Sequence, residues 1–118
     1  MKNVQIIDTQ EKSGYYELSI WENHAEKIIG YFTLDFEVSP VEIGYYEIGY
    51  EFRDLGLGKS ALEEIIEFVK FLGFNSLRLL VSVENEKAQH IYRKAGFKFL
   101  DYMSEWCYKM ELLFVQNP

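Results

Sequence analysis

The chain has 118 residues, of which 48% are hydrophobic and 17% aromatic, so it can form one packed core and is too apolar to be disordered. Nineteen acidic residues against twelve basic ones give a formal net charge of −7, which argues against nonspecific nucleic-acid binding, because that binding needs a basic surface to replace phosphate counterions. The same charge is compatible with a cationic partner such as an amine, and it is also an ordinary means of solubility.

The sequence gives no sign of a membrane or secretory protein. No apolar run approaches the roughly 20 residues of a membrane-spanning helix, and the apolar stretch within residues 1–8 is too short for a signal peptide. Cys107 is the only cysteine, so no internal disulfide can form. We therefore expect a cytoplasmic protein without membrane association.

The first 48 residues predict four strands joined by short polar turns. The segments are rich in aromatic and β-branched residues, and the second alternates between apolar and polar positions. The predicted strands are residues 3–8, 15–22, 27–37 and 41–48. The predicted turns are residues 9–14, Asn23-His24 and Ser39-Pro40. Connections this short favour an antiparallel meander.

The apolar pattern then changes to helical spacing. Apolar residues recur at intervals of three and four through residues 60–72, and Gly73 ends the run. Asn85 is suited to cap a second helix, which presents an apolar face and has Gly96 at its C′ position. The sequence therefore predicts two helices in the second half.

Three further strands complete the predicted fold. They cover residues 76–83, 97–103 and 106–114, which gives the order β-β-β-β-α-β-α-β-β. The fold class is therefore α+β, with one mixed, mostly antiparallel sheet. Its strand-helix-strand step should be a right-handed parallel crossover.

A glycine-rich turn, Arg-Asp-Leu-Gly-Leu-Gly-Lys-Ser at residues 53–60, enters the first predicted helix. Glycines there let the backbone approach a ligand, and the free N–H groups of a first helical turn attract phosphate. Arg53 stands where a Walker A loop needs glycine, which argues against a nucleotide triphosphatase. The Gly56-x-Gly58-x-x-Ala61 spacing fits a dinucleotide fingerprint, but a loop separates it from its strand and the acidic residue comes late. A plain helix-entry turn also remains open.

Two motifs together resemble the GNAT superfamily of N-acetyltransferases. Arg53-x-x-Gly56-x-Gly58 is similar to the family's Gln/Arg-x-x-Gly-x-Gly/Ala signature. A second motif, Asn85-x-x-Ala88-x-x-x-Tyr92-x-x-x-Gly96-Phe97, is similar to the helix after the family's fifth strand. The resemblance implies one domain over residues 1–118, in which 1–40 are N-terminal strands and 41–114 an acetyl-CoA-binding core.

The resemblance also implies where acetyl-CoA, the acyl donor, is held. In the family the fourth and fifth strands splay apart, and the pantetheine arm pairs with the backbone of the fourth strand, here near Ile48. The pyrophosphate lies against N–H groups of the glycine turn. Asn85 and Tyr92 match positions that contact the cofactor, although Asn85 is equally a helix cap. The turn residues implied in binding are Arg53, Asp54, Leu55, Gly56, Leu57, Gly58, Lys59 and Ser60.

Two catalytic residues follow from the same resemblance. Tyr92 matches the usual general acid, which protonates the leaving thiolate, although an aromatic residue on an apolar helix face is also an ordinary core residue. Counting back from Gly56 places Glu42 where several members carry a glutamate base. A shifted register would promote Glu47 but would leave too short a loop before the turn. Members with a base on the fifth strand have glutamate where Leu80 stands.

Other reactive residues have no implied role. His24 lies in a turn, His90 on the polar side of a helix and Cys107 in a closing strand, so we expect neither a histidine base nor an acyl-cysteine intermediate. No residues have metal-ligand spacing, and no metal is expected.

The N-terminal half departs from the family pattern. Members usually have two helices between the first two strands, where this chain has only the turn at 9–14. Either the acceptor side is open and admits a bulky acceptor, or another subunit completes it. Strand alternation puts about half of the many aromatic residues of this region on the uncovered face, which favours a homodimer.

The predicted function is transfer of the acetyl group of acetyl-CoA to a primary amine by direct attack. A non-catalytic acyl-CoA-binding or protein-interaction module on the same fold is the alternative, and a nucleotide-binding regulator that uses the glycine turn is a third hypothesis. Fold analogy leaves the acceptor open among polyamines, amino acids, aminoglycosides and peptides.

Overall fold

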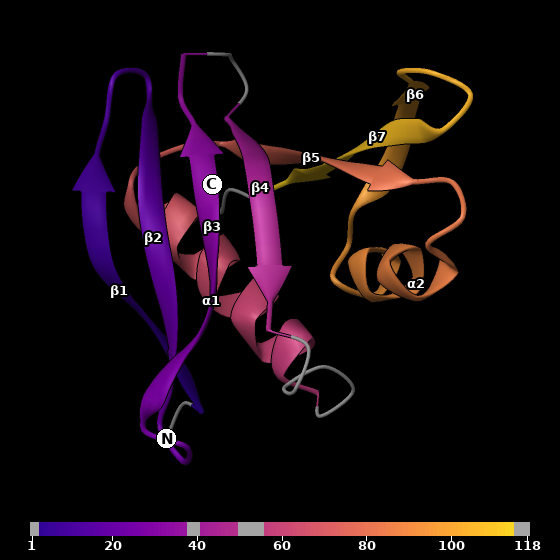
Figure 1. The fold of residues 1–118 in the computed structure, drawn as a ribbon. Helices are drawn as coiled ribbons and strands as arrows, with labels where there is room; N and C mark the ends of the chain where they lie inside the picture. The colour runs from indigo at the N-terminus through magenta and orange to yellow at the C-terminus, as the bar shows by residue number, and fades with distance from the viewer. Residues whose placement is uncertain (1–2, 38–40, 50–55, 115–118) are drawn as a thin grey trace.

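The computed structural model describes residues 3–37, 41–49 and 56–114. Within these residues the elements follow the predicted order (Figure 1). The strands are β1 Val4–Glu11, β2 Tyr15–Glu22, β3 Lys27–Asp35, β4 Glu42–Ile48, β5 Ser76–Ser82, β6 Lys98–Tyr102 and β7 Cys107–Leu113. The helices are α1 Leu57–Phe71 and α2 Glu86–Lys94.

The strands form one seven-stranded sheet in the order β1-β2-β3-β4-β5-β7-β6. All neighbouring strands are antiparallel except β4 and β5, which are parallel and are connected through α1. The α+β class and the mixed, mostly antiparallel sheet are therefore confirmed.

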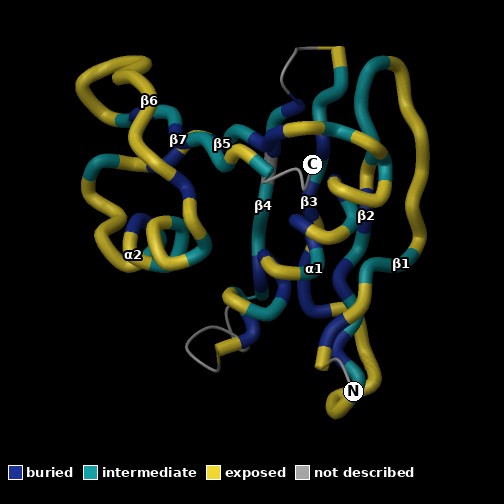
Figure 2. The backbone as a smooth tube through the Cα atoms, turned by 180° about the vertical axis from the view of Figure 1, so that it is seen from behind, coloured by how far each residue is buried: buried dark blue, intermediate teal, exposed yellow. Residues whose placement is uncertain are grey.

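Both helices pack on one face of this sheet. Helix α1 lies behind β1–β4 in Figure 1 and buries the apolar residues Leu57, Ala61, Leu62, Ile65, Ile66 and Val69. From α2, Arg93 donates a hydrogen bond to the hydroxyl of Tyr108, which alternates onto the same face of β7 as the buried Met110. Burial follows the central strands and α1, whereas β6 is exposed along its whole length (Figure 2).

The opposite face carries no helix among the described residues. Tyr15, Trp21 and Tyr31 alternate onto it, but Glu17 and Ser19 lie between the first two along β2. Four other aromatic residues of the N-terminal half belong to the core or pack against it: Tyr16, Phe32, Phe36 and Tyr46. Polar residues thus interrupt the aromatic surface from which a homodimer was expected. The side chain of Tyr45 and all of Tyr50 lie outside the described residues.

Element limits differ from the predictions where apolar residues give no signal. Strand β1 continues to Glu11 because Gln10 and Glu11 pair with β2, so the turn is shorter than residues 9–14. The ladder shifts register between Ile7 and Gln10. Helix α1 begins at Leu57, three residues before the predicted start. The prediction missed these residues because 57–59 contain only one apolar residue and show no periodicity.

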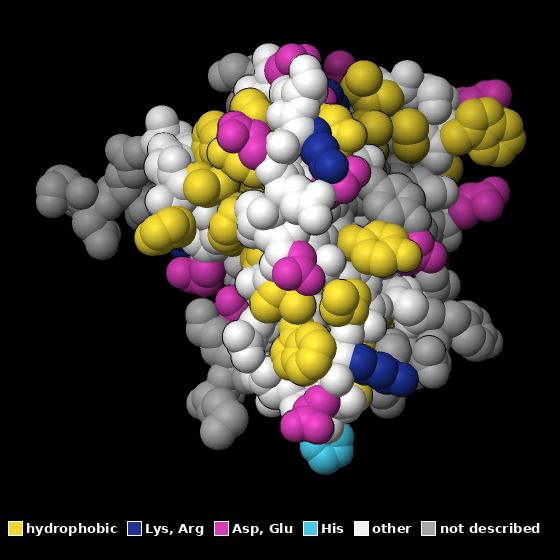
Figure 3. Space-filling model, turned by 60° about the vertical axis from the view of Figure 1, so that its left-hand side comes forward, with side chains coloured by type: hydrophobic (Ala, Val, Ile, Leu, Met, Phe, Trp, Pro, Cys, Tyr) yellow, Lys and Arg dark blue, Asp and Glu magenta, His cyan; other side chains and the backbone are white. Residues whose placement is uncertain are grey.

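The charged side chains on the β1 side of the surface are dispersed (Figure 3). Seen from the β1 side, acidic side chains are spread among hydrophobic and polar ones, with fewer lysines and arginines (Figure 3). On this side the net negative charge is therefore not gathered into a single patch. Neither described helix combines the length and the hydropathy that a membrane span requires.

Candidate functional site

Strands β4 and β5 are paired at one end only. Their parallel ladder joins Glu42 to Arg78 and Ile43 to Leu79, and the Arg78 N–H donates to the Val41 carbonyl at 2.9 Å. Beyond this ladder β4 runs toward the start of α1 while β5 runs toward α2 (Figure 1). The predicted splay of the central strands is therefore present.

A pocket of about 110 Å³ occupies the opening. Its walls come from β4, β5 and α2, and they combine aliphatic side chains with two phenols. The lining residues are Ile43, Gly44, Tyr46, Leu79, Leu80 and Tyr92. Leu79 and Leu80 alternate onto opposite faces of β5, so the pocket is bounded by residues from both faces of the sheet.

Side-chain hydrogen bonds fix α2 beside this opening. The Asn85 side chain accepts a hydrogen bond from the Ala88 N–H at 3.1 Å, which confirms Asn85 as the helix N-cap. The buried Gln89 amide donates to the carbonyls of Ser82 and Val83 at 2.9 and 3.0 Å, which ties the helix to the end of β5. These bonds set the position of the turn that carries Tyr92.

Tyr92 is half-buried between the pocket and the core. Its ring packs against Phe97 with 5.9 Å between ring centroids, so part of the side chain is an ordinary packing element. Burial raises the pKa of Tyr92 above its usual value of about 10. The hydroxyl is therefore protonated at neutral pH and can donate a proton or a hydrogen bond into the pocket.

A second phenol, Tyr46, enters the pocket from β4. Its hydroxyl donates to the Gly58 carbonyl in the first turn of α1 at 2.9 Å. Burial is the main cause of its raised pKa, and the charge of an ionised Tyr92 would raise it further, which places the two phenols near one another. Tyr46 was not among the predicted site residues. Alternation from Ile48 would have put it on the buried face.

Glu42 lies on the other face of β4 from Tyr46. Strict alternation would place both residues on one face, but the β3–β4 register shifts at Gly44, so that Ile43 takes the face of Tyr46. The Glu42 carboxylate accepts a hydrogen bond from the Lys109 ammonium at 3.3 Å, and both side chains are largely covered. Glu42 is therefore beside the closed end of the splay and does not line its pocket.

In the described part of the glycine turn, the two glycines differ in backbone conformation and in the space around them. Gly56 is the N-cap of α1 with φ of 76°, a left-handed conformation that favours glycine, and its carbonyl accepts the Ser60 N–H at 3.3 Å. Gly58 lacks a positive φ, and among the described residues a Cβ placed on it would meet no atom of another segment within 4 Å. Space for a ligand is thus available beside Gly58.

The remaining predicted binding residues are near this turn or outside the described residues. Leu57, the first residue of α1, is buried, whereas Lys59 in the same turn is exposed. Ile48 is buried and pairs with Gly30 of β3, at the end of β4 that leads to the turn. Arg53, Asp54 and Leu55 lie outside the described residues.

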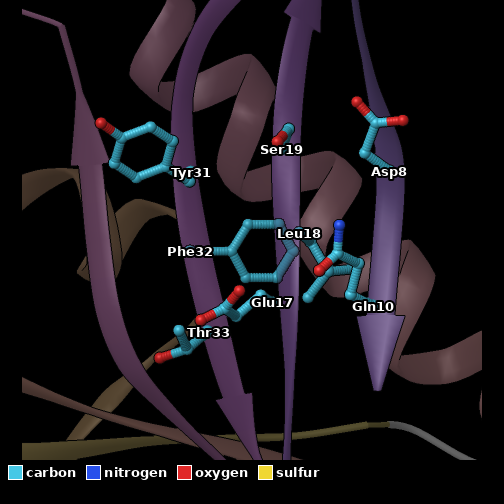
Figure 4. A pocket seen from close by; sticks show the side chains of 8 residues that line it. All are labelled: Asp8, Gln10, Glu17, Leu18, Ser19, Tyr31, Phe32 and Thr33. Atoms are coloured by element: carbon cyan, nitrogen blue, oxygen red, sulfur yellow. The ribbon is translucent and has the colours of Figure 1, made fainter. Parts of the chain in front are cut away.

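A larger hollow of about 380 Å³ lies away from the splay, over β1–β3 (Figure 4). Its lining is Asp8, Gln10, Glu17, Leu18, Ser19, Tyr31, Phe32 and Thr33. Helix α1 lies behind these strands in the view. None of the residues of either sequence motif lines this hollow, so its size does not make it the candidate site.

Comparison with known protein families gives one match. A model of the acetyltransferase (GNAT) family matches residues 3–97. No sequence among curated proteins matches significantly.

Many solved structures share the fold, including three acetyltransferases. Spermidine N-acetyltransferase from Vibrio cholerae, in complex with CoA and spermine, superposes with a TM-score of 0.75 at 19% identity, over 86% of this chain and 66% of that one. PaiA N-acetyltransferase from Thermoplasma acidophilum, in complex with coenzyme A, gives 0.72 at 24% identity over 86% and 62%. IAA acetyltransferase from Bacillus cereus gives 0.73 at 18% identity over 86% and 79%. This chain thus spans slightly less than two thirds of the length of the first two relatives.

Proposed function

Because this chain belongs to the acetyltransferase (GNAT) family, we propose that it transfers the acetyl group of acetyl-CoA to a primary amine. The observation that carries the proposal is the pocket between β4 and β5, which is lined by Tyr92 and connected through Tyr46 to the first turn of α1. One site can thus hold both the thioester and the phosphates of the same donor.

The donor would lie along β4 from the pocket to the start of α1. The pantetheine arm occupies the splay near Ile48, and the pyrophosphate meets backbone N–H groups of the glycine turn, residues 53–60. The open space beside Gly58 and the positive end of the helix dipole both favour this placement. Asn85 caps α2 through its oxygen, which leaves its amide N–H groups available to contact the cofactor.

Transfer would proceed by direct attack. The neutral amine nitrogen adds to the thioester carbonyl carbon, and the C–S bond then breaks with its electron pair going to sulfur. The nitrogen gives its proton to a base, and Tyr92 donates to the departing thiolate. A thiol pKa of about 8.5 makes thiolate a fair leaving group, so Tyr92 accelerates this step without being indispensable.

The base requirement depends on the amine. A lysine-type amine has a pKa of about 10.4, about 3.4 units above pH 7, so removing its proton at that pH costs roughly 4.6 kcal/mol. For an α-amino group with a pKa near 8 the same deprotonation costs about 1.4 kcal/mol. Glu42 is our candidate for the base. Its pairing with Lys109 outside the pocket lining means that a proton would reach it through intervening water.

Polyamines are one acceptor class that we propose to test. The first of the similar structures contains spermine together with CoA, and the net charge of −7 in this chain is compatible with a cationic acceptor. Amino acids, aminoglycosides and peptide N-termini complete the set of candidate amines.

The donor assignment is tested by thermal unfolding with four ligands. Acetyl-CoA and CoA should raise Tm, because a ligand at 100 times its Kd stabilises the folded state by about 2.7 kcal/mol. ATP and NAD should leave Tm unchanged. Stabilisation by NAD or ATP but not by CoA would instead make the glycine turn a nucleotide site.

A further inference from the structure

Tyr46 contacts two parts of the candidate site that lie on different elements. Its ring lines the splay pocket with Tyr92, and its hydroxyl donates to the carbonyl of Gly58 at 2.9 Å. This bond joins residues 12 positions apart, from β4 to the first turn of α1. The same side chain therefore reaches from the thioester end of the site to its phosphate end.

We propose that Tyr46 is a positioning residue, which fixes the first turn of α1 so that the Lys59 N–H meets the pyrophosphate of acetyl-CoA. The inference rests on the proposed function, since it presupposes acetyl-CoA in the splay. It assigns Tyr46 no proton transfer and no contact with the acceptor.

The link from Tyr46 to Lys59 is the peptide plane. The Gly58 carbonyl and the Lys59 N–H belong to one rigid planar unit, so a hydrogen bond that holds the carbonyl also orients the N–H. In a helix the N–H groups of the first turn point toward the N-terminal end and have no intrahelical acceptor. Gly58 has no side chain to restrict this plane by packing, and no atom of another described segment lies within 4 Å of its Cβ position.

The protonation state of Tyr46 suits this role. Burial and the neighbouring Tyr92 both raise its pKa, so its hydroxyl remains protonated and donates to Gly58 over the whole neutral range. The hydroxyl proton of Tyr46 is engaged in that bond, whereas the hydroxyl proton of Tyr92 is the one that we propose for the leaving thiolate. The two phenols of one pocket thus have separable roles.

Two variants that each remove one hydroxyl from the pocket test the proposal. Tyr46→Phe should raise the KM for acetyl-CoA and the Kd for CoA by about 5- to 10-fold, the size of one hydrogen bond, with kcat within about twofold of wild type. Acetyl-pantetheine lacks the pyrophosphate, and its KM should be unaffected by Tyr46→Phe. Tyr92→Phe is the matched control and should instead lower kcat with both donors.

The outcomes separate this inference from the proposed function. A wild-type protein that binds no CoA would remove the proposed function itself. If wild type binds CoA but Tyr46→Phe binds it equally well, or loses as much with acetyl-pantetheine as with acetyl-CoA, the positioning role is overturned.

If Tyr46→Phe fails to fold, a measurement on the wild type still tests the proposal. In an NMR titration, the Lys59 amide resonance should shift with CoA and not with pantetheine. An unchanged Lys59 resonance under saturating CoA would also overturn the inference.

Discussion

The hydroxyl of Tyr92 is our candidate for the donor to a leaving thiolate, since it is protonated and its ring lines the splay pocket. Tyr92→Phe removes only this hydroxyl and keeps the ring packed against Phe97. We expect kcat to fall by about 10- to 100-fold, at or below the usual range for general acids because thiolate already leaves readily. Tm should change little. An unchanged kcat at pH 7, with chemistry shown to limit the rate, would make Tyr92 a core residue only.

Glu42 can be tested as a base through the pH dependence of its variant. With a lysine-type acceptor, Glu42→Gln should lower kcat/KM by about 10-fold or more at pH 7, where a base must take up the proton of the ammonium. The loss should shrink as the pH rises toward about 10.4, because the amine then loses that proton to solvent.

A matched control for this variant lies on the same face of the sheet. Glu111 forms an ion pair with Arg78 at 2.6 Å, as Glu42 does with Lys109 at 3.3 Å. Glu111→Gln removes a comparable ion pair, with Arg78, which lies opposite Glu42 in the β4–β5 ladder. Because Glu111 does not line the pocket, this variant should leave the pH profile unaltered. If Glu42→Gln lowers kcat/KM by the same factor at every pH, and by as much as Glu111→Gln does, then Glu42 only forms an ion pair in the sheet and is not the base.

At residue scale, the sequence locates groups whose spacing is local. Asn85 and Tyr92 lie within one helix motif, and the predicted cap of Asn85 is confirmed by its bond to Ala88. The bond from Tyr46 to Gly58 joins separate elements and leaves no periodic signal. The side on which Glu42 lies depends on a register shift at Gly44, which alternation in β4 does not reveal.

At the scale of elements, strands and helices with an apolar face were predicted well. Strand β2 has the predicted limits, and both helices end beside the predicted glycines. The differences arise in polar segments, where backbone pairing or helix geometry continues past the last apolar residue. The extra residues of β1 and the early start of α1 are both of this kind.

Substitutions at the two glycines at the start of α1 should have different effects. Gly58→Val adds a side chain in open space, so the ligand-free Tm should be nearly unchanged while acetyl-CoA affinity falls at least 10-fold. Gly56→Ala forces alanine into a left-handed conformation and should lower the ligand-free Tm, at a cost of about 1–2 kcal/mol. Isothermal titration and thermal unfolding measure the two effects. Equal acetyl-CoA affinity in wild type and Gly58→Val would remove the turn from the donor site.

At the scale of the whole molecule, a sheet with helices on one face leaves the other face, where we expect the acceptor, uncovered by any helix among the described residues. A homodimer that covers this side stays a prediction, with less support now that Glu17 and Ser19 interrupt the aromatic residues there. Light scattering at micromolar concentration should give twice the chain mass of 14.0 kDa. A mass near 14.0 kDa that acetyl-CoA does not change would contradict the dimer and favour a bulky acceptor in an open groove.

Amine-dependent release of CoA from acetyl-CoA distinguishes an acetyltransferase from a binding module. Free thiol and acetylated product are measured together, by a thiol reagent and by mass spectrometry, with polyamines, amino acids, aminoglycosides and peptides as acceptors. We expect at least one amine to give thiol and N-acetylated product in equal amounts, and Tyr92→Phe to slow the formation of both equally. Tight acetyl-CoA binding with no thiol release above the amine-free rate for any acceptor would contradict the proposed function, and would make the chain a non-catalytic acyl-CoA-binding module.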